Sequence, residues 1–370
     1  METLLDGIDE KKEVLKTSEV IEYLGVSKHK LNKMIKDGKI NVYKNEKNRN
    51  EFSKIEIEKY KEEHGDSLEP SVDARNNMNE LTGKEWLPET KSFWYQKGLG
   101  ASHPHAQIER QHPAPFSFQD VQRLVLFFTK KGQKVLDPFS GTGSTVKACA
   151  VSERIGVGIE LSKHWCDLSK YRIEYEVGEG ESLKHTFINQ DCREALDNMD
   201  KESIDLIVTS PPYWSILNKK IDHKTKKRAE EGLATNYSDD KKDLANIDDY
   251  NEFLDELKDV FIKSAKVLKE NKYICVIVSD FRNKSEFVSF HSDLIQIMNK
   301  SEVDSKHELM LQGVKVLLQN HKSLLPYGYP FSYVENIHHQ YILIFKKQVK
   351  KANKKTKDNS KEENKNGLGL

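Results

Sequence analysis

Apolar residues follow a helical spacing near the start of the chain, over residues 16–64. One group runs from Val20 to Leu24 and a second from Leu31 to Ile35. Gly25 can end the first predicted helix and Ser27 can cap the second. Glycine tolerates the left-handed turn at a helix end, and a serine hydroxyl can accept a free amide at a helix start. The pattern therefore predicts two short helices joined by a turn.

A polar hairpin and a third helix are predicted to follow. Asp37-Gly38 can turn the chain into a strand over residues 40–43, residues 49–52 can return as its partner, and Ser53 can begin the last helix. The run TSEVIEYLGVSKHKLNKMIKDGKINVY resembles the winged helix-turn-helix of excisionase and MerR-like proteins. The resemblance implies a DNA-binding module over residues 16–64, with contacts from the wing and from Lys28, Lys30 and Lys33. A small protein-interaction module with lysines on a solvated face is the alternative.

Polar stretches predict the domain boundaries. Residues 1–15 are expected to form a flexible N-terminus, and residues 65–92 begin in a polar stretch without periodic apolar positions, as a linker would. Residues 349–370 are rich in Lys, Asn and Glu, a composition that cannot offset the entropy of ordering and predicts a disordered tail. Residues 93–348 remain as a catalytic domain in which strands alternate with helices, which predicts an α/β fold.

A glycine-containing loop connects the first buried strand of this domain to a helix. Val135-Leu136 lead into Asp137-Pro138-Phe139-Ser140-Gly141-Thr142-Gly143, and Ser144-Thr145 can begin the helix. The two glycines allow the backbone to approach a ligand closely. The arrangement predicts a ligand site at the carboxyl end of the strand.

Carboxylates are predicted at the ends of two further strands. Glu160 ends the strand over residues 156–159 and is placed to accept hydrogen bonds from both hydroxyls of a ribose, as in dinucleotide folds. Asp191 follows residues 188–190, where it could bind an adenine amino group. The glycine loop alone fits NAD, flavin and nucleoside-phosphate sites. The Gly-Lys-Ser/Thr of a P-loop and the third glycine of the dinucleotide motif are both missing.

A proline-rich loop supplies the candidate catalytic residues. The strand over residues 204–208 stops at Thr209-Ser210-Pro211-Pro212-Tyr213-Trp214. Such a loop suits methyl transfer to the exocyclic amine of a nucleic-acid base. This amine is a poor nucleophile because its lone pair is conjugated with the ring. Ser210 Oγ and the Pro211 carbonyl can accept its two hydrogens and aim the lone pair at a methyl donor, so orientation is the main catalytic effect. Pro212 stiffens the loop, and Tyr213 can stack on a base rotated out of the duplex. Taken in isolation, the loop is better explained as a proline turn with buried aromatic residues, but its position after a buried strand and downstream of the cofactor strands favours the catalytic interpretation.

Together, DPFSGTGS and TSPPYW resemble the DNA methylase family that modifies cytosine N4 or adenine N6, over about residues 93–347. HPAPFS, at residues 112–117, resembles the segment that these enzymes place against the methionine end of S-adenosylmethionine. The glycine loop precedes the catalytic loop here, whereas many relatives have the reverse order. The resemblance implies a Rossmann-like methyltransferase sheet and S-adenosylmethionine as cofactor, bound by Phe116, Ser117, Asp137, Phe139, Gly141, Gly143, Ser144, Thr145, Glu160 and Asp191.

Ser210 predicts which base is modified. Relatives with Ser at this position commonly methylate cytosine N4, and those with Asp or Asn methylate adenine N6. None of the four cysteines follows a proline, as the nucleophile of ring-carbon methylation would. We therefore expect a site-specific cytosine-N4 DNA methyltransferase of restriction-modification or phage defence. Adenine N6 is the first alternative, and a DNA-binding regulator with a nucleoside-sensing domain is the second. The expected partners are double-stranded DNA and a cognate restriction endonuclease, with the protein a monomer or homodimer.

A charged segment follows the catalytic loop. Residues 215–250 are poorly periodic and predict a DNA-recognition insertion, with a solvated insertion as the alternative. Its candidate phosphate ligands are Lys219, Lys220, Lys224, Lys227 and Arg228.

Composition limits the remaining possibilities. Lys and Arg total 59 and Asp and Glu total 59, so the net charge is zero and any nucleic-acid surface must be local. The four cysteines form no CxxC pair, and the histidines of HPHAQIERQH lack a standard metal-ligand spacing, so we expect no metal and reduced thiols. Neither a signal peptide nor an apolar run of membrane-spanning length occurs, which predicts a soluble cytoplasmic protein.

Overall fold

The computed structural model describes residues 14–68, 72–97, 103–114, 116–215, 230–238 and 240–351. The chain divides into two compact units, Met1–Thr90 and Lys91–Leu370. No helix in these described ranges is both long enough and apolar enough to cross a membrane.

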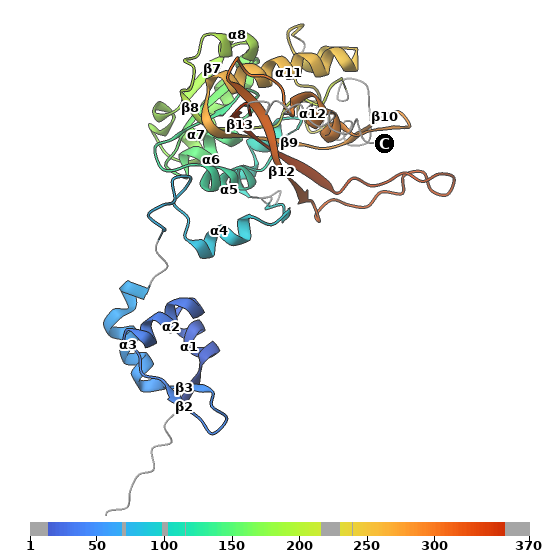
Figure 1. Ribbon diagram of the computed structural model, residues 1–370. Coiled ribbons are helices and arrows are strands. Elements are labelled where there is room, and N and C mark those ends of the chain that lie inside the picture. The colour runs from blue at the N-terminus through green and yellow to red at the C-terminus, as the bar shows by residue number, and fades with distance from the viewer. Residues whose placement is uncertain are drawn as a thin grey trace, which may run out of the picture. The chain divides into compact units, whose positions relative to one another are not determined.

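The first unit packs short helices around a small antiparallel sheet (Figure 1). Gly25 ends α1 with a φ of 65°, and Ser27 Oγ accepts the Lys30 amide at 3.1 Å at the start of α2, as the sequence predicts. The buried side chains of Val20, Leu31, Phe52 and Ile57 form its core. The elements are β1 (Val14–Lys16), α1 (Thr17–Leu24), α2 (Lys28–Lys36), β2 (Tyr43–Lys44), β3 (Asn50–Ser53) and α3 (Lys54–Leu68), with the strands in the order β1-β3-β2.

The segment expected to be a linker contains regular structure. Helix α3 continues to Leu68, and α4 occupies Gly83–Glu89. Thr82 and Glu85 form a capping box at the start of α4, in which each side chain bonds the other residue's backbone amide. The polar composition of the segment predicted no helix, but Thr82 and Glu85 specify where α4 begins.

An eight-stranded sheet organises the second unit. Its order is β4-β12-β13-β9-β8-β5-β6-β7. Strands β9, β8, β5, β6 and β7 are parallel, and β13 is antiparallel to both of its neighbours. The strands are β4 (Phe93–Tyr95), β5 (Lys134–Asp137), β6 (Ile155–Glu160), β7 (Thr186–Asn189), β8 (Ile204–Thr209), β9 (Leu268–Val278), β12 (His307–Leu318) and β13 (His339–Val349); β10 (Phe281–Asn283) and β11 (Glu286–Val288) form a separate hairpin.

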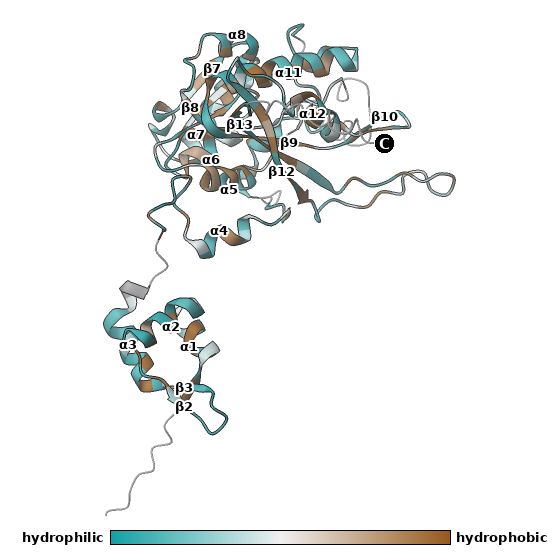
Figure 2. Cartoon of the chain, in the orientation of Figure 1, coloured by the Kyte–Doolittle hydropathy of each residue, from teal (hydrophilic) through white to brown (hydrophobic). Residues whose placement is uncertain are grey.

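Two groups of helices pack on this sheet, as Figure 1 shows. One group comprises α5 (Phe118–Phe128), α6 (Ser144–Ala150) and α7 (Lys163–Glu176), and the other comprises α8 (Cys192–Asp197), α11 (Tyr250–Val267) and α12 (Phe290–Met298). Hydrophobic residues are concentrated in the sheet strands and the helix faces that cover them (Figure 2). The mixed α/β sheet confirms the predicted fold class.

The strand order places a ligand crevice at one position. The chain leaves β5 toward β6 and β7, then returns to add β8 and β9 on the other side of β5. In open α/β sheets, ligands bind beyond the carboxyl ends of the strands at such a reversal. The glycine loop after β5 and the proline loop after β8 therefore face the same space.

Candidate active site

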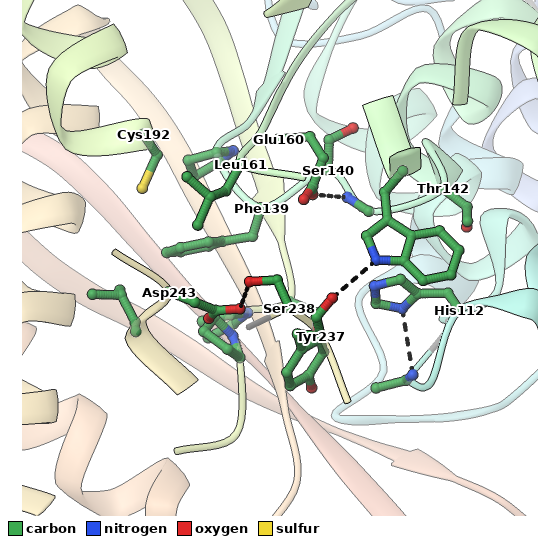
Figure 3. A pocket seen from close by; sticks show the side chains of 18 of the residues that line it. His112, Phe139, Ser140, Thr142, Glu160, Leu161, Cys192, Tyr237, Ser238 and Asp243 are labelled. Carbon is green, nitrogen blue, oxygen red and sulfur yellow. Dashed lines mark hydrogen bonds between the residues drawn. The ribbon is translucent and has the colours of Figure 1, made fainter. Parts of the chain in front are cut away.

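A cavity lies at these strand ends (Figure 3). Among the residues predicted to bind cofactor, Phe116, Phe139, Gly141, Ser144, Glu160 and Asp191 line it. The four predicted catalytic residues, Ser210, Pro211, Pro212 and Tyr213, line it too.

Asp137 ties the two loops together from beneath the cavity. Its fully buried carboxylate accepts the Thr145 hydroxyl at 2.6 Å and the Thr209 hydroxyl at 2.6 Å. The Phe139 amide adds a third bond at 3.0 Å. Burial raises the pKa of Asp137 to about 6, although these hydrogen bonds oppose the rise. Because Thr209 directly precedes Ser210, Asp137 fixes the start of the proline loop against the glycine loop.

Four of the residues predicted to bind cofactor are not among those that line the cavity, namely Ser117, Asp137, Gly143 and Thr145. Asp137 and Thr145 bond each other, and Ser117 Oγ donates to the Lys97 carbonyl at 2.8 Å. A Cβ on Gly143 would overlap Ser169 Oγ of α7, so the packing of α7 requires this glycine. All four residues shape the loops and do not contact the cavity.

Glu160 has a restrained carboxylate. Gly141 donates its amide to Oε2 at 2.8 Å, and Ser162 donates its amide to Oε1 at 2.9 Å. Burial raises the pKa of Glu160 to about 7, against the effect of these two bonds. Each carboxylate oxygen can accept a second hydrogen bond. Glu160 therefore keeps acceptor capacity for a diol in the cavity.

Asp191 is paired with a neighbouring arginine. Arg193 Nη2 lies 2.6 Å from Oδ2, Nε lies 3.0 Å from Oδ1, and the Arg193 amide also bonds Oδ1. Burial would raise the pKa of Asp191, but the hydrogen bonds and charge of Arg193 lower it below its ordinary value. Asp191 is thus an ionised wall of the cavity with its orientation fixed.

The segment before α11 forms part of the cavity wall, which the sequence did not predict. Tyr237, Ser238, Lys242, Asp243 and Leu244 line the cavity, although they fall inside the expected DNA-recognition insertion. The Ser238 hydroxyl donates to Asp243 at 2.7 Å, and burial raises the pKa of Asp243. This part of the insertion builds the pocket, whereas Lys219, Lys220, Lys224, Lys227 and Arg228 lie outside the described residues.

Aromatic residues close one end of the cavity. Trp165 donates its indole N–H to the Tyr237 carbonyl at 3.2 Å, and the His112 ring centroid lies 5.0 Å from the Trp165 ring and 5.6 Å from the Tyr237 ring. Figure 3 shows His112 and Tyr237 at one side and Leu161 with Cys192 at the other. Periodicity could not reveal this wall because its members come from three distant segments.

The proline loop is held by hydrogen bonds to the Tyr213 hydroxyl. Gln340 of β13 donates to the Tyr213 hydroxyl at 3.4 Å. Burial raises the pKa of Tyr213, while hydrogen bonds from Ser210 and Gln340 oppose the rise. Trp214 is buried in the core against Tyr250, at 5.1 Å between ring centroids, and does not line the cavity. Tyr213 is therefore the aromatic residue that this loop contributes to the cavity.

Buried charges support the glycine loop from the α7 side. Arg172 donates to the Thr142 carbonyl at 3.2 Å and to Glu109 at 2.7 Å. Arg172 and Lys147 also meet Glu176, which is fully buried. The cluster links the segment before α5 to the glycine loop. In the part of the chain that the structure describes, no group of three or more His, Cys, Asp or Glu side chains could hold a metal ion.

A family model described as DNA methylase (N6_N4_Mtase) matches residues 9–171 and 204–368. The chain belongs to this DNA methylase family. The resemblance predicted from DPFSGTGS and TSPPYW is thereby confirmed. The family depends on S-adenosylmethionine, so the predicted cofactor is confirmed at the level of the family.

Several methyltransferases are similar to parts of this DNA methylase. The orphan methyltransferase M.BamHII of Bacillus amyloliquefaciens is 37% identical over 68 residues, 18% of this chain and 26% of that protein. The Type II methyltransferase M.BglI of Bacillus subtilis is 32% identical over 98 residues, 26% of each protein. M.MjaI of Methanocaldococcus jannaschii, also a Type II methyltransferase, is 42% identical over 81 residues, 21% of this chain and 26% of that protein. The matches thus span about a quarter of these relatives' lengths.

Solved structures give further likenesses. TrmN from Thermus thermophilus matches with a TM-score of 0.39 and 13% identity, covering 66% of this chain and 53% of TrmN. TTHA0409, also from Thermus thermophilus and solved with S-adenosyl-L-methionine, matches with a TM-score of 0.27 and 23% identity, covering 42% of this chain and 52% of that one.

Proposed function

We propose that this protein is a site-specific DNA methyltransferase that transfers a methyl group from S-adenosylmethionine to the exocyclic N4 of a flipped cytosine. The observation that carries the proposal is the Asp137 bridge. Its carboxylate bonds Thr145 at the start of α6 and Thr209 immediately before Ser210, both at 2.6 Å. The glycine loop and the proline loop are thus fixed around one cavity, which supports roles for them in binding the cofactor and orienting the amine.

The cavity residues fit the chemical groups of S-adenosylmethionine. The Glu160 carboxylate would accept the ribose hydroxyls, and Phe139 and Leu161 offer apolar surface for a purine ring. Ser140 Oγ is buried in the cavity wall without a hydrogen-bond partner in the described structure, which leaves a polar atom for the ligand to satisfy. When bound, the cofactor supplies a methyl group activated by a sulfonium.

The proline loop would orient the substrate amine. The Ser210 hydroxyl oxygen has two lone pairs and would accept one amine N–H. The Pro211 carbonyl would accept the second hydrogen. The base would stack on Tyr213, whose hydroxyl is held by Gln340. Direct transfer in this arrangement needs no cysteine nucleophile.

Cytosine N4 is proposed from the identity of Ser210. Unmethylated phage DNA is incubated with the protein and methyl-labelled cofactor and then digested to nucleosides, which should contain labelled N4-methyl-2′-deoxycytidine by mass spectrometry. Labelled N6-methyl-2′-deoxyadenosine in its place would establish the adenine alternative and overturn the choice of base. If the DNA carries no label although the protein binds the cofactor, only the second alternative would remain, a DNA-binding regulator with a nucleoside-sensing domain.

The first unit is proposed to be a winged helix-turn-helix that contacts DNA. Lys28 and Lys33 are exposed on α2 and Lys30 is half-buried, while Leu31 and Met34 face the core. The similar Type II methyltransferases support a restriction-modification setting with a partner endonuclease.

A further inference from the structure

Strands β12 and β13 continue past the sheet as a long hairpin, residues 319–338, which we name the aromatic arm. Figure 1 shows it projecting from the body of its unit. The arm has its own internal bonds. The Gln319 amide donates to the His338 carbonyl at 2.8 Å, and Asn336 both accepts the Leu325 amide at 3.0 Å and donates to the Leu325 carbonyl at 2.8 Å. The arm is therefore an ordered projection.

The tip of the arm carries large aromatic side chains in water. Tyr329 is 81% exposed, Phe331 93% and Tyr333 85%. A single exposed apolar residue is ordinary, but several on one projecting element mark an interaction surface. The tip has a fixed shape, because Phe331 and Ser332 both donate their amides to the Gly328 carbonyl, at 2.7 and 2.8 Å.

The base of the arm is connected to the catalytic loop. Gln319 Nε2 donates to Gln340 Oε1 at 3.2 Å and to Gln96 Oε1 at 3.1 Å. Gln340 in turn donates to the Tyr213 hydroxyl at 3.4 Å. Gln319 is 6% exposed, so this connection is buried. The element that presents the exposed rings thus begins where the substrate base is expected to enter.

We propose that the aromatic arm binds DNA beside the target nucleotide, by stacking Tyr329, Phe331 and Tyr333 on bases exposed when that nucleotide leaves the duplex. This inference rests on the proposed function. The arm contains one lysine and one glutamate, Lys322 and Glu335, so it cannot act by neutralising phosphates. Planar rings next to an entry site for a base favour stacking on bases, and stacking depends little on base identity.

The test replaces the rings and measures affinity for DNA. The triple variant Tyr329→Ser/Phe331→Ser/Tyr333→Ser should fold normally, because the three side chains are almost fully exposed. A fluorescein-labelled 30-base-pair duplex of random sequence carrying one central mismatch serves as the anisotropy probe. We expect a loss of affinity of about tenfold to hundredfold. The salt dependence should keep the wild-type slope, because no phosphate contact is removed.

Matched variants separate stacking from other effects. Tyr171→Ser/Tyr175→Ser removes two rings that are 55% and 68% exposed on α7, and should leave affinity for the probe unchanged. Phe331→Trp should keep the affinity that Phe331→Ser loses. Unchanged DNA affinity in the triple variant would overturn the proposal. If that result came with a change from dimer to monomer by light scattering, the arm would be a contact with a second copy of the chain.

Methyl transfer by the wild-type protein is scored separately with labelled cofactor. If the wild type transfers no methyl group while its affinity for DNA still depends on the rings, the proposed function fails and the arm's role stands. If methyl transfer is normal and the affinity for DNA does not depend on the rings, the proposed role of the arm is wrong and the proposed function stands.

Discussion

Single residues set the chemistry of the cavity, and Glu160 gives its clearest pH dependence. Its pKa is raised to about 7, and protonation would remove the negative charge and turn one acceptor position into an O–H donor, which weakens the hydrogen bonds from the ribose hydroxyls. The ionised form should therefore bind the nucleoside more tightly, and affinity should fall as the pH drops through about 7. Between pH 8 and pH 6 we expect a loss of about tenfold, by proton linkage to one group.

5′-Methylthioadenosine is the ligand for this titration, because it keeps the ribose diol and lacks the titrating amino acid of S-adenosylmethionine. Calorimetry at each pH measures the dissociation constant. The matched variant Glu160→Gln should bind more weakly and without this pH dependence. A wild-type affinity that stays flat from pH 6 to pH 8 would contradict the assignment of Glu160 to the ribose.

Ser210 should act on turnover and not on cofactor affinity. Ser210→Ala removes an acceptor for the substrate amine while Glu160, Phe139 and Leu161 remain in place. Loss of one orienting hydrogen bond in a closed site typically costs about 10²- to 10³-fold in rate. Single-turnover methyl transfer and calorimetric cofactor binding measure the two effects, and full activity in Ser210→Ala would refute the mechanism.

Asp137 should affect stability and cofactor affinity indirectly, by holding the glycine loop and the proline loop together. Asp137→Ala leaves the Thr145 and Thr209 hydroxyls without their shared acceptor in a fully buried position, at a cost of about 1–3 kcal/mol for each unsatisfied group. We expect a lower melting temperature and a weaker cofactor affinity, by calorimetry. Thr209→Ser keeps the hydroxyl and is the matched control, expected to stay close to wild type in both measurements.

At the scale of elements, buried charges join α6, α7 and the segment before α5, and we expect them to contribute to stability as a coupled group. Arg172 has no exposed side-chain surface and neutralises Glu109 and Glu176. Arg172→Met leaves the Glu109 carboxylate without this ion pair and Glu176 with Lys147 alone, and breaking a buried pair typically costs about 3–5 kcal/mol. Denaturant unfolding should show that Arg172→Met/Glu176→Met loses less stability than the sum of the single variants. Additive losses would mean that the pair is not coupled.

The elements also show what sequence patterns could predict. The strands beside the cavity were predictable because each is a short apolar run followed by its functional residue, as at Asp137, Glu160 and Ser210. Strand β12 was missed because it is half-buried and interrupted by Gln312 and Lys315, with an irregular register between Leu311 and Gly313. The Tyr237–Leu244 wall was missed because a charged composition conceals residues that tertiary packing brings to the cavity.

At the scale of the whole molecule, the second unit contains the complete cavity. Lys91 and Ser92 begin its sheet contacts, since Lys315 Nζ bonds the Lys91 carbonyl at 2.6 Å and the Val316 amide bonds the Ser92 carbonyl at 2.9 Å. A chain starting at Lys91 should therefore keep its fold and its cofactor affinity. Circular dichroism and calorimetry check both. Loss of cofactor binding would show that the site depends on the first unit.

The first unit should then supply affinity for DNA through phosphate contacts. Lys28 and Lys33 are exposed on α2, so Lys28→Ala/Lys33→Ala in the full chain removes two charges without disturbing the core. Each phosphate contact contributes about 0.9 to the slope of log affinity against log salt concentration, so two lost contacts should reduce the slope by about 1.8. Lys59→Ala is the control, because Lys59 is exposed on α3 and its ammonium lies 3.8 Å from Glu63. An unchanged slope in the double variant would favour the protein-interaction alternative.

The aromatic arm is expected to change the affinity for DNA without changing this slope, because stacking on bases releases no counterions. The same salt titration therefore separates phosphate contacts of the first unit from base stacking by the arm.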